Sequence, residues 1–374
     1  MTNKHLLISL VVLIGVLILA GLAGFSLYST SQLQPGDNNG LNSLPVLQTS
    51  TSTVNPTDAR IEAAYAVVES KEVLSQGNTD LLNALATFRD VAADTNNTNF
   101  QRAQALNGIN YAYTQSNFDA TDVYDVVFSQ PPFSSYYTAS TTEAVDPLRP
   151  ASGSNAAAVE AALVNLNELS NSLTPNHYAI SRMEVADVFA FQRIVAQSPA
   201  SQKTQLQQTY AAKMKDLIAA FNALPSLSSI QTYSPPMRLQ IMFVHASALA
   251  FVGRTFKDQT YLDEGESAFQ DTIDLAGTYS PTDAYFNLTL NQSLLARIEY
   301  ASYYWNEYQQ TDPQRIEAVL QPLTDVATVK DTAVYTNYLP SIKNMQVAPA
   351  SVLRTVAAQM PTLKTFLQGE GWTF

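Results

Sequence analysis

Apolar residues recur after residue 57 at intervals of three and four, the spacing that places side chains on one face of an α-helix. Ile61, Tyr65 and Val68 share such a face. Longer stripes follow at Val159, Leu163, Leu166, Leu169 and Leu173, and at Leu353, Val356, Met360, Leu363 and Leu367. Pro361 interrupts the last stripe and should kink or split its helix. The pattern predicts an all-α fold.

The number of glycines agrees with a helical rather than a β-rich domain. Only eight of the 13 glycines lie in residues 58–374, fewer than the turns of a β-rich domain of that length require. Helices are predicted near 58–75, 79–94, 99–116, 119–129, 155–172, 175–197, 199–223, 235–254, 259–278, 284–309, 313–328 and 350–368. Asn78 and Ser234 precede two of them as N-cap residues. Most loops are short, which favours antiparallel neighbours, whereas residues 130–154 indicate an irregular insertion.

Leu6–Tyr28 has a different pattern, because it is apolar and carries no charge over 23 residues. At about 1.5 Å per residue, a helix of this length crosses a hydrocarbon core of about 30 Å. Lys4 precedes the segment and the next basic residue is Arg60, so we expect a cytoplasmic N-terminus. The bulk of the chain should then be extracytoplasmic, in the periplasm or at the cell surface. A signal peptide cleaved after Gly21–Ala23 is the alternative.

These patterns divide the chain into three regions. Residues 1–28 are an anchor whose transmembrane helix covers 6–28. Residues 29–57 are rich in Ser, Thr, Asn, Gln and Pro, which predicts a flexible linker. Residues 58–374 form the helical domain, which we expect to be held close to the membrane surface.

Composition and charge exclude several functional classes. The chain has no Cys, so disulfides, thiol nucleophiles and Cys-ligated metals are excluded. The formal net charge of −12 argues against nucleic acid as a partner, because phosphate binding needs a basic surface. The sequence contains no phosphate-binding loop, nucleophile elbow, zinc-protease pair or EF-hand loop. We therefore expect no enzyme activity, no cofactor and no metal site.

One window has the spacing of a helical repeat. Its residues are Ala84, Phe88, Gly108, Tyr111, Ala120, Tyr124 and Pro132. They resemble the tetratricopeptide repeat (TPR), in which small residues lie where the two helices of a hairpin cross and aromatic residues fill the space between hairpins. The resemblance implies a TPR-like α-solenoid of antiparallel helix hairpins, with Gly108 opposite Ala120. Gln104 and Asn107 stand where the family has Trp and Leu, and an irregular all-helical domain is the alternative.

Two groups of residues are candidates for binding a partner. Tyr300, Tyr304 and Tyr308 follow one another four residues apart on one helical face, and tyrosine is enriched at protein interfaces. Packing between helices is the alternative for this stripe. In the repeat-like unit, the face that binds peptides in TPR proteins offers Arg102, Ala105, Leu106, Ile109 and Tyr113. Only Arg102 suits a carboxylate, so apolar and aromatic contacts should dominate there.

Histidines and acids are expected to be structural or solvated. His245 lies in an apolar helical stretch, which predicts a hydrogen-bonded core residue, whereas His177 starts a helix and should be exposed. An acidic run matches no calcium loop and predicts a solvated helix face. Its members are Asp263, Glu264, Glu266, Asp271 and Asp274.

The leading hypothesis is a membrane-anchored extracytoplasmic scaffold or adaptor that holds another envelope protein or a peptide in a groove. The chain would have two partners: the membrane, through residues 6–28, and the envelope protein or peptide that it holds. The alternative is a structural subunit of a surface layer or filament, which would self-associate. An enzyme or a solute-binding receptor is the less favoured third hypothesis.

Overall fold

The computed structural model describes residues 55–70, 78–115, 120–138, 156–227, 233–280, 285–308, 311–329 and 361–369, together with residues 283 and 358. Helices and turns make up these parts of the chain, without any strand, which confirms the all-α prediction. The predicted transmembrane helix 6–28, nearly all of the linker 29–57 and residues 139–154 of the insertion lie outside the described residues.

The described parts of the chain fold into a series of helices. They are α2 (Pro56–Val68), α3 (Thr79–Ala93), α4 (Asn99–Gln115), α5 (Ala120–Val123), η2 (Tyr124–Phe128), η3 (Phe133–Tyr136), α6 (Ala156–Leu173), α7 (His177–Gln197), α8 (Ala200–Asn222), α9 (Pro235–Phe256), α10 (Gln259–Ala276), α11 (Phe286–Tyr308), α12 (Pro313–Val329) and α15 (Pro361–Gly369). The side chain of Asn78 accepts hydrogen bonds from the backbone N–H groups of Asp80 and Leu81, and Ser234 accepts one from Met237. Both predicted N-caps are confirmed.

Three predicted helices differ in the structure. The helix expected at 58–75 is α2, which ends at Val68 with Glu69 as its C-cap. The helix expected at 119–129 has its predicted bounds within one residue, but it consists of a single α-helical turn, α5, continued by the π-helical turn η2. The helix expected at 350–368 is described from Pro361, where α15 begins, and of the residues before it only 358 is described.

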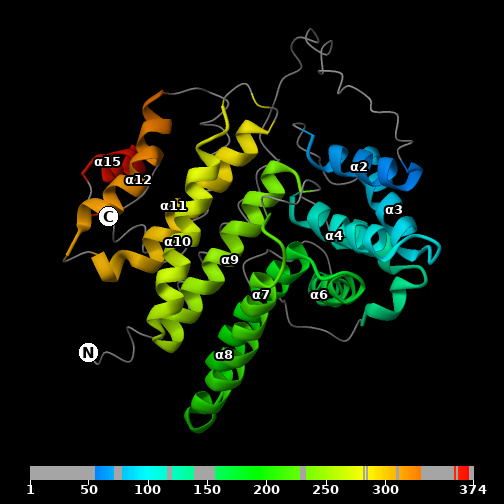
Figure 1. Cartoon of the computed structure of the whole chain (residues 1–374), viewed down its shortest axis with the longest axis horizontal. Coiled ribbons are helices and arrows are strands. Elements are labelled where there is room, and N and C mark those ends of the chain that lie inside the picture. The colour runs from blue at the N-terminus through cyan, green and yellow to red at the C-terminus, as the bar shows by residue number, and fades with distance from the viewer. Residues whose placement is uncertain are drawn as a thin grey trace.

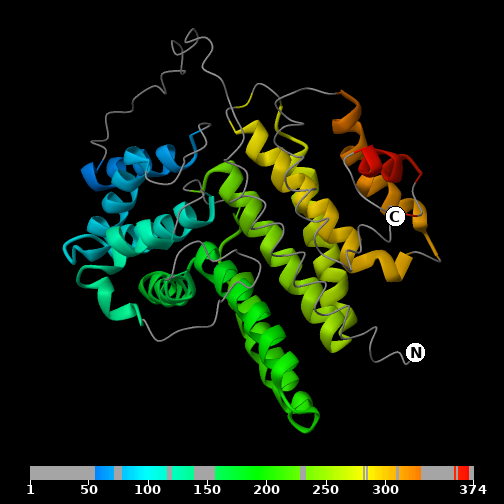
Figure 2. The ribbon, with the colours of Figure 1, turned by 180° about the vertical axis from the view of Figure 1, so that it is seen from behind.

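Most helices pack on the next, and several also pack on the next but one. These additional contacts join α2 to α4, α7 to α9 and α9 to α11. Figure 1 shows α2–α4 at one end of the molecule and α12 with α15 at the other, while the α7–α8 hairpin extends beyond the body. The view from behind shows the same extension (Figure 2).

The hydrophobic core has two adjoining parts. The N-terminal part includes Phe88 and Tyr178, and the C-terminal part includes Phe251 and Phe269. Helices α7, α8 and α9 contribute to both parts, so they form the junction of the molecule. The buried carboxylate of Glu69, at the end of α2, accepts a hydrogen bond from the Ser234 hydroxyl at the start of α9 and adds a polar link between α2 and α9.

Glycines allow two helix pairs to approach closely. A Cβ atom at Gly265 of α10 would lie 2.8 Å from the backbone nitrogen of Ala250 in α9. A Cβ atom at Gly108 of α4 would lie 2.5 Å from Cε1 of Phe88 in α3. Gly108 was expected to face Ala120 of the following helix, but its three nearest neighbouring atoms all belong to Phe88 of the preceding one.

One described helix, α9, is long and apolar enough to cross a membrane, and 78% of its most apolar window is buried inside the protein. Its neighbours α7, α8, α10 and α11 cover it, so its apolar side chains are used in the core.

Candidate functional site

The tyrosine stripe of α11 faces the interior of the fold. Tyr300 and Tyr304 are buried, and the Tyr304 hydroxyl donates to the backbone oxygen of Leu262 at 2.6 Å. The hydroxyls of Tyr300 and Tyr308 both donate to the carboxylate of Glu266, at 2.5 Å and 2.7 Å. These contacts join α11 to α10 and agree with the packing alternative for this stripe.

The residues of the repeat-like window also pack within the fold. Ala84, Phe88, Tyr111 and Ala120 are buried, Tyr124 is half-buried and Pro132 is exposed directly before η3. Arg102 donates through Nε to the backbone oxygen of Ala92 at 3.0 Å. Tyr113 is buried, and its hydroxyl donates to Glu160 at 3.3 Å. The structure therefore does not bring the predicted partner-binding residues of α4 and α11 together at one open surface.

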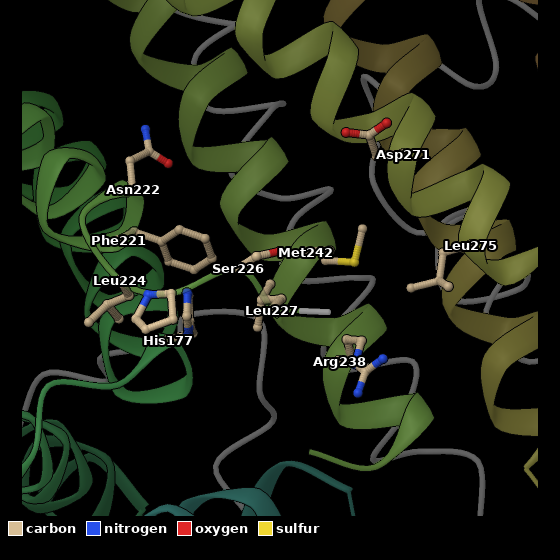
Figure 3. A pocket seen from close by; sticks show the side chains of 11 residues that line it. His177, Phe221, Asn222, Leu224, Ser226, Leu227, Arg238, Met242, Asp271 and Leu275 are labelled. Atoms are coloured by element: carbon tan, nitrogen blue, oxygen red, sulfur yellow. The ribbon is translucent and has the colours of Figure 1, made fainter. Parts of the chain in front are cut away.

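A pocket of about 460 Å³ lies elsewhere, between the end of α8 and the α9–α10 pair (Figure 3). The residues around it are His177, Phe221, Asn222, Leu224, Pro225, Ser226, Leu227, Arg238, Met242, Asp271 and Leu275. We call it the α8–α10 pocket. Most of its lining is apolar, with a few polar and charged groups at the edges, which is the usual composition of a binding site.

The residue that sequence reasoning placed wrongly is His177. It is 2% exposed, because the ring packs edge-on against Phe221 at 4.7 Å and against Tyr233 at 6.5 Å. Burial, with a smaller contribution from the neighbouring His245, lowers the pKa of His177 from 6.5 to about 4. The imidazole is therefore neutral at neutral pH, and its Nδ1 atom has no hydrogen-bond partner among the described residues.

His245 lies behind the wall of this pocket. Its Nδ1 atom is 2.9 Å from Oε1 of Glu184, and both side chains are buried, which confirms the predicted hydrogen-bonded core histidine. The Phe221 ring stacks on the His245 ring with 3.7 Å between centroids and 7° between planes. Since Phe221 lines the pocket and neither His245 nor Glu184 does, the phenyl ring separates the histidine–carboxylate pair from any occupant.

Other buried acids lie away from the pocket lining. Glu299 is 1% exposed, both of its carboxylate oxygens lack partners within the described chain, and burial raises its pKa well above the usual range. Asp187 pairs with Nζ of Lys213 at 2.5 Å. Among the described residues, no group of three His, Asp or Glu side chains is placed to hold a metal ion.

The apolar residues of the α8–α9 connection were missed by sequence reasoning. Leu224 and Leu227 follow the end of α8 in a segment without helical periodicity. Two leucines in such a loop were the sequence signal that could have indicated an apolar pocket wall. Met242 lies in the same apolar helical stretch as His245, which carries no local signal for a pocket.

Comparison with known proteins gives no match: no family model matches the chain, and no curated protein or solved structure matches it significantly.

Proposed function

We propose that the chain is a membrane-anchored extracytoplasmic scaffold or adaptor that holds a segment of another envelope protein in the α8–α10 pocket. The proposal includes a TPR-like solenoid as its architecture. Support for the solenoid comes from the order of contacts, in which α7 packs on α8 and α9, and α9 packs on α10 and α11. Such an order is typical of stacked helix hairpins, where each repeat contacts its neighbours.

The wall formed by Phe221 carries the proposal. It presents an aromatic ring and aliphatic side chains to an occupant, and it keeps the only described histidine–carboxylate pair out of reach. Burying one apolar side chain contributes about 1.5–3 kcal/mol, enough for an anchor residue of a partner segment. A few such anchors dominate the affinity of most protein interfaces.

Location in the envelope depends on the N-terminal segment. Leu6–Tyr28 would anchor the chain, and residues 29–57 would allow the helical domain to reach a partner near the membrane. Since α9 is covered by its neighbours, Leu6–Tyr28 is the segment that we assign to the membrane.

Site-specific photo-crosslinking in intact cells tests this function. A benzophenone amino acid at Met242, inside the pocket, should give an adduct with one defined envelope protein. The matched control is Met183, another partly buried methionine, which packs against the N-terminal core and does not line the pocket. Equal adducts at the two positions, or none at Met242, would contradict the proposal. An adduct with a second copy of the chain would support the surface-layer alternative.

A further inference from the structure

The α8–α10 pocket has opposite charges at its two ends. Arg238 and Met242 lie one turn apart on α9, and Asp271 and Leu275 lie one turn apart on α10. Helices α9 and α10 are antiparallel neighbours, so the two charged residues come to opposite ends while the two apolar residues lie between them. Figure 3 shows this order, with Asp271 and Arg238 far apart and Met242 and Leu275 in the middle.

The outer face of α10 extends the negative end of the pocket. Asp263, Glu264, Asp271 and Asp274 are exposed and recur at helical spacing. Asp263 and Asp274 accept hydrogen bonds from the neutral side chains of Gln259 and Gln270. Arg297 of α11 has an electrostatic interaction with Asp274. Asp271, the member that lines the pocket, has no partner within the described residues.

His177 is a further polar residue of the pocket lining. It is 98% buried, and its Nδ1 atom has no hydrogen-bond partner among the described residues. Nδ1 is itself closed off from solvent, so an occupant of the pocket would meet the ring edge and not this nitrogen.

We infer that the occupant is a polypeptide segment in which an apolar side chain, bound between Met242 and Leu275, stands next to a Lys or Arg that faces Asp271. The inference rests on the proposed function and specifies the chemistry of the partner. Charge complementarity supports it, because an acidic segment would meet the carboxylates of α10, and a second basic residue at the other end would meet Arg238. The same carboxylates would repel an anionic lipid surface.

Selection from a phage-displayed library of random peptides tests this inference on the full chain in detergent micelles. Enriched peptides should carry Lys or Arg beside an apolar residue. Asp271→Asn should remove this preference and weaken the best peptide about five-fold, which corresponds to about 1 kcal/mol, while Asp271→Lys should reverse the preference towards acidic peptides. Asp125→Asn, an exposed acid of η2, is the matched control and should change neither result.

The outcomes separate the inference from the function on which it rests. One outcome would overturn the inference and leave the proposed function intact. In it, the enriched peptides are neutral or acidic beside the apolar residue, and their binding is abolished by Met242→Gln but not by Met183→Gln. Enrichment that Met242→Gln does not reduce, or no enrichment, would overturn both. Circular dichroism melts of the variants show that a loss of binding does not come from unfolding.

Discussion

Gly108→Ala should destabilise the protein, although alanine is the better helix former. The added Cβ atom would lie 2.5–2.6 Å from Cε1, Cδ1 and Cζ of Phe88, well inside van der Waals contact. The Phe88 ring cannot easily move, because it is fully buried and packs edge-on against Tyr65 at 4.9 Å.

Two opposing terms set the magnitude. Replacing glycine by alanine inside a helix gains about 1 kcal/mol, whereas overpacking a core costs about 1–3 kcal/mol. With three ring atoms inside the contact distance, we expect a net loss of up to about 2 kcal/mol for Gly108→Ala, and a larger loss for Gly108→Leu. In a Phe88→Leu background, which lacks the aromatic ring, Gly108→Ala should instead stabilise the protein by up to about 1 kcal/mol.

Thermal melts of the full chain in detergent measure the effect of Gly108→Ala with Phe88 and with Leu at position 88. Each kcal/mol corresponds to a shift of the melting midpoint of about 2–4 °C in proteins somewhat smaller than this one. The control is Gly369→Ala in α15, where an added Cβ meets nothing within 4 Å and no loss is expected. A midpoint that rises with Gly108→Ala in the wild-type background, or the same sign in both backgrounds, would refute the close approach of α3 and α4.

Three further predictions concern titration and topology. The pKa of His177 is about 4 in the folded protein and about 6.5 in the unfolded chain. The stability that His177 contributes should therefore be complete above pH 6.5 and decrease by up to about 3 kcal/mol towards pH 4. The difference in melting midpoint between wild type and His177→Gln should shrink over that range. The pKa of Glu299 is raised, so its cost to stability should grow as pH rises above about 4.5, and Glu299→Gln should raise the midpoint at pH 7 but not at pH 4; an equal gain at both pH values would contradict this. Protease added to spheroplasts should digest residues 30–374 while Leu6–Tyr28 stays in the membrane, whereas a mature N-terminus at Gly24 would show cleavage instead.

Most of the helical architecture follows from local signals. The helices expected at 79–94, 99–116 and 259–278 agree with α3, α4 and α10 within two residues, because their apolar period and their end signals are encoded in the segments themselves. The exposure of Asp263, Glu264, Asp271 and Asp274 is confirmed as well. Glu266 differs from these acids, since it accepts hydrogen bonds from tyrosines that lie more than 30 residues away in the sequence.

The pocket depends on contacts that no local pattern encodes. His177 has the sequence context of an exposed helix start, yet Phe221 and Tyr233, which are distant in the sequence, bury it. Likewise, periodicity gives Met242 a core position, and only the packing of α8, α9 and α10 opens space beside it. The resemblance to the TPR family identified small and aromatic packing residues, but the atoms nearest to Gly108 come from the preceding helix.

Hydrogen–deuterium exchange of the full chain, with and without the envelope protein captured at Met242, tests the central claim most directly. Binding in the α8–α10 pocket predicts slower exchange in residues 221–227 and in the adjoining parts of α9 and α10, with α2, α3 and α4 unchanged. Protection confined to α2–α4, or no protection at the pocket under saturating partner, would contradict the claim that this pocket is where the chain holds its partner.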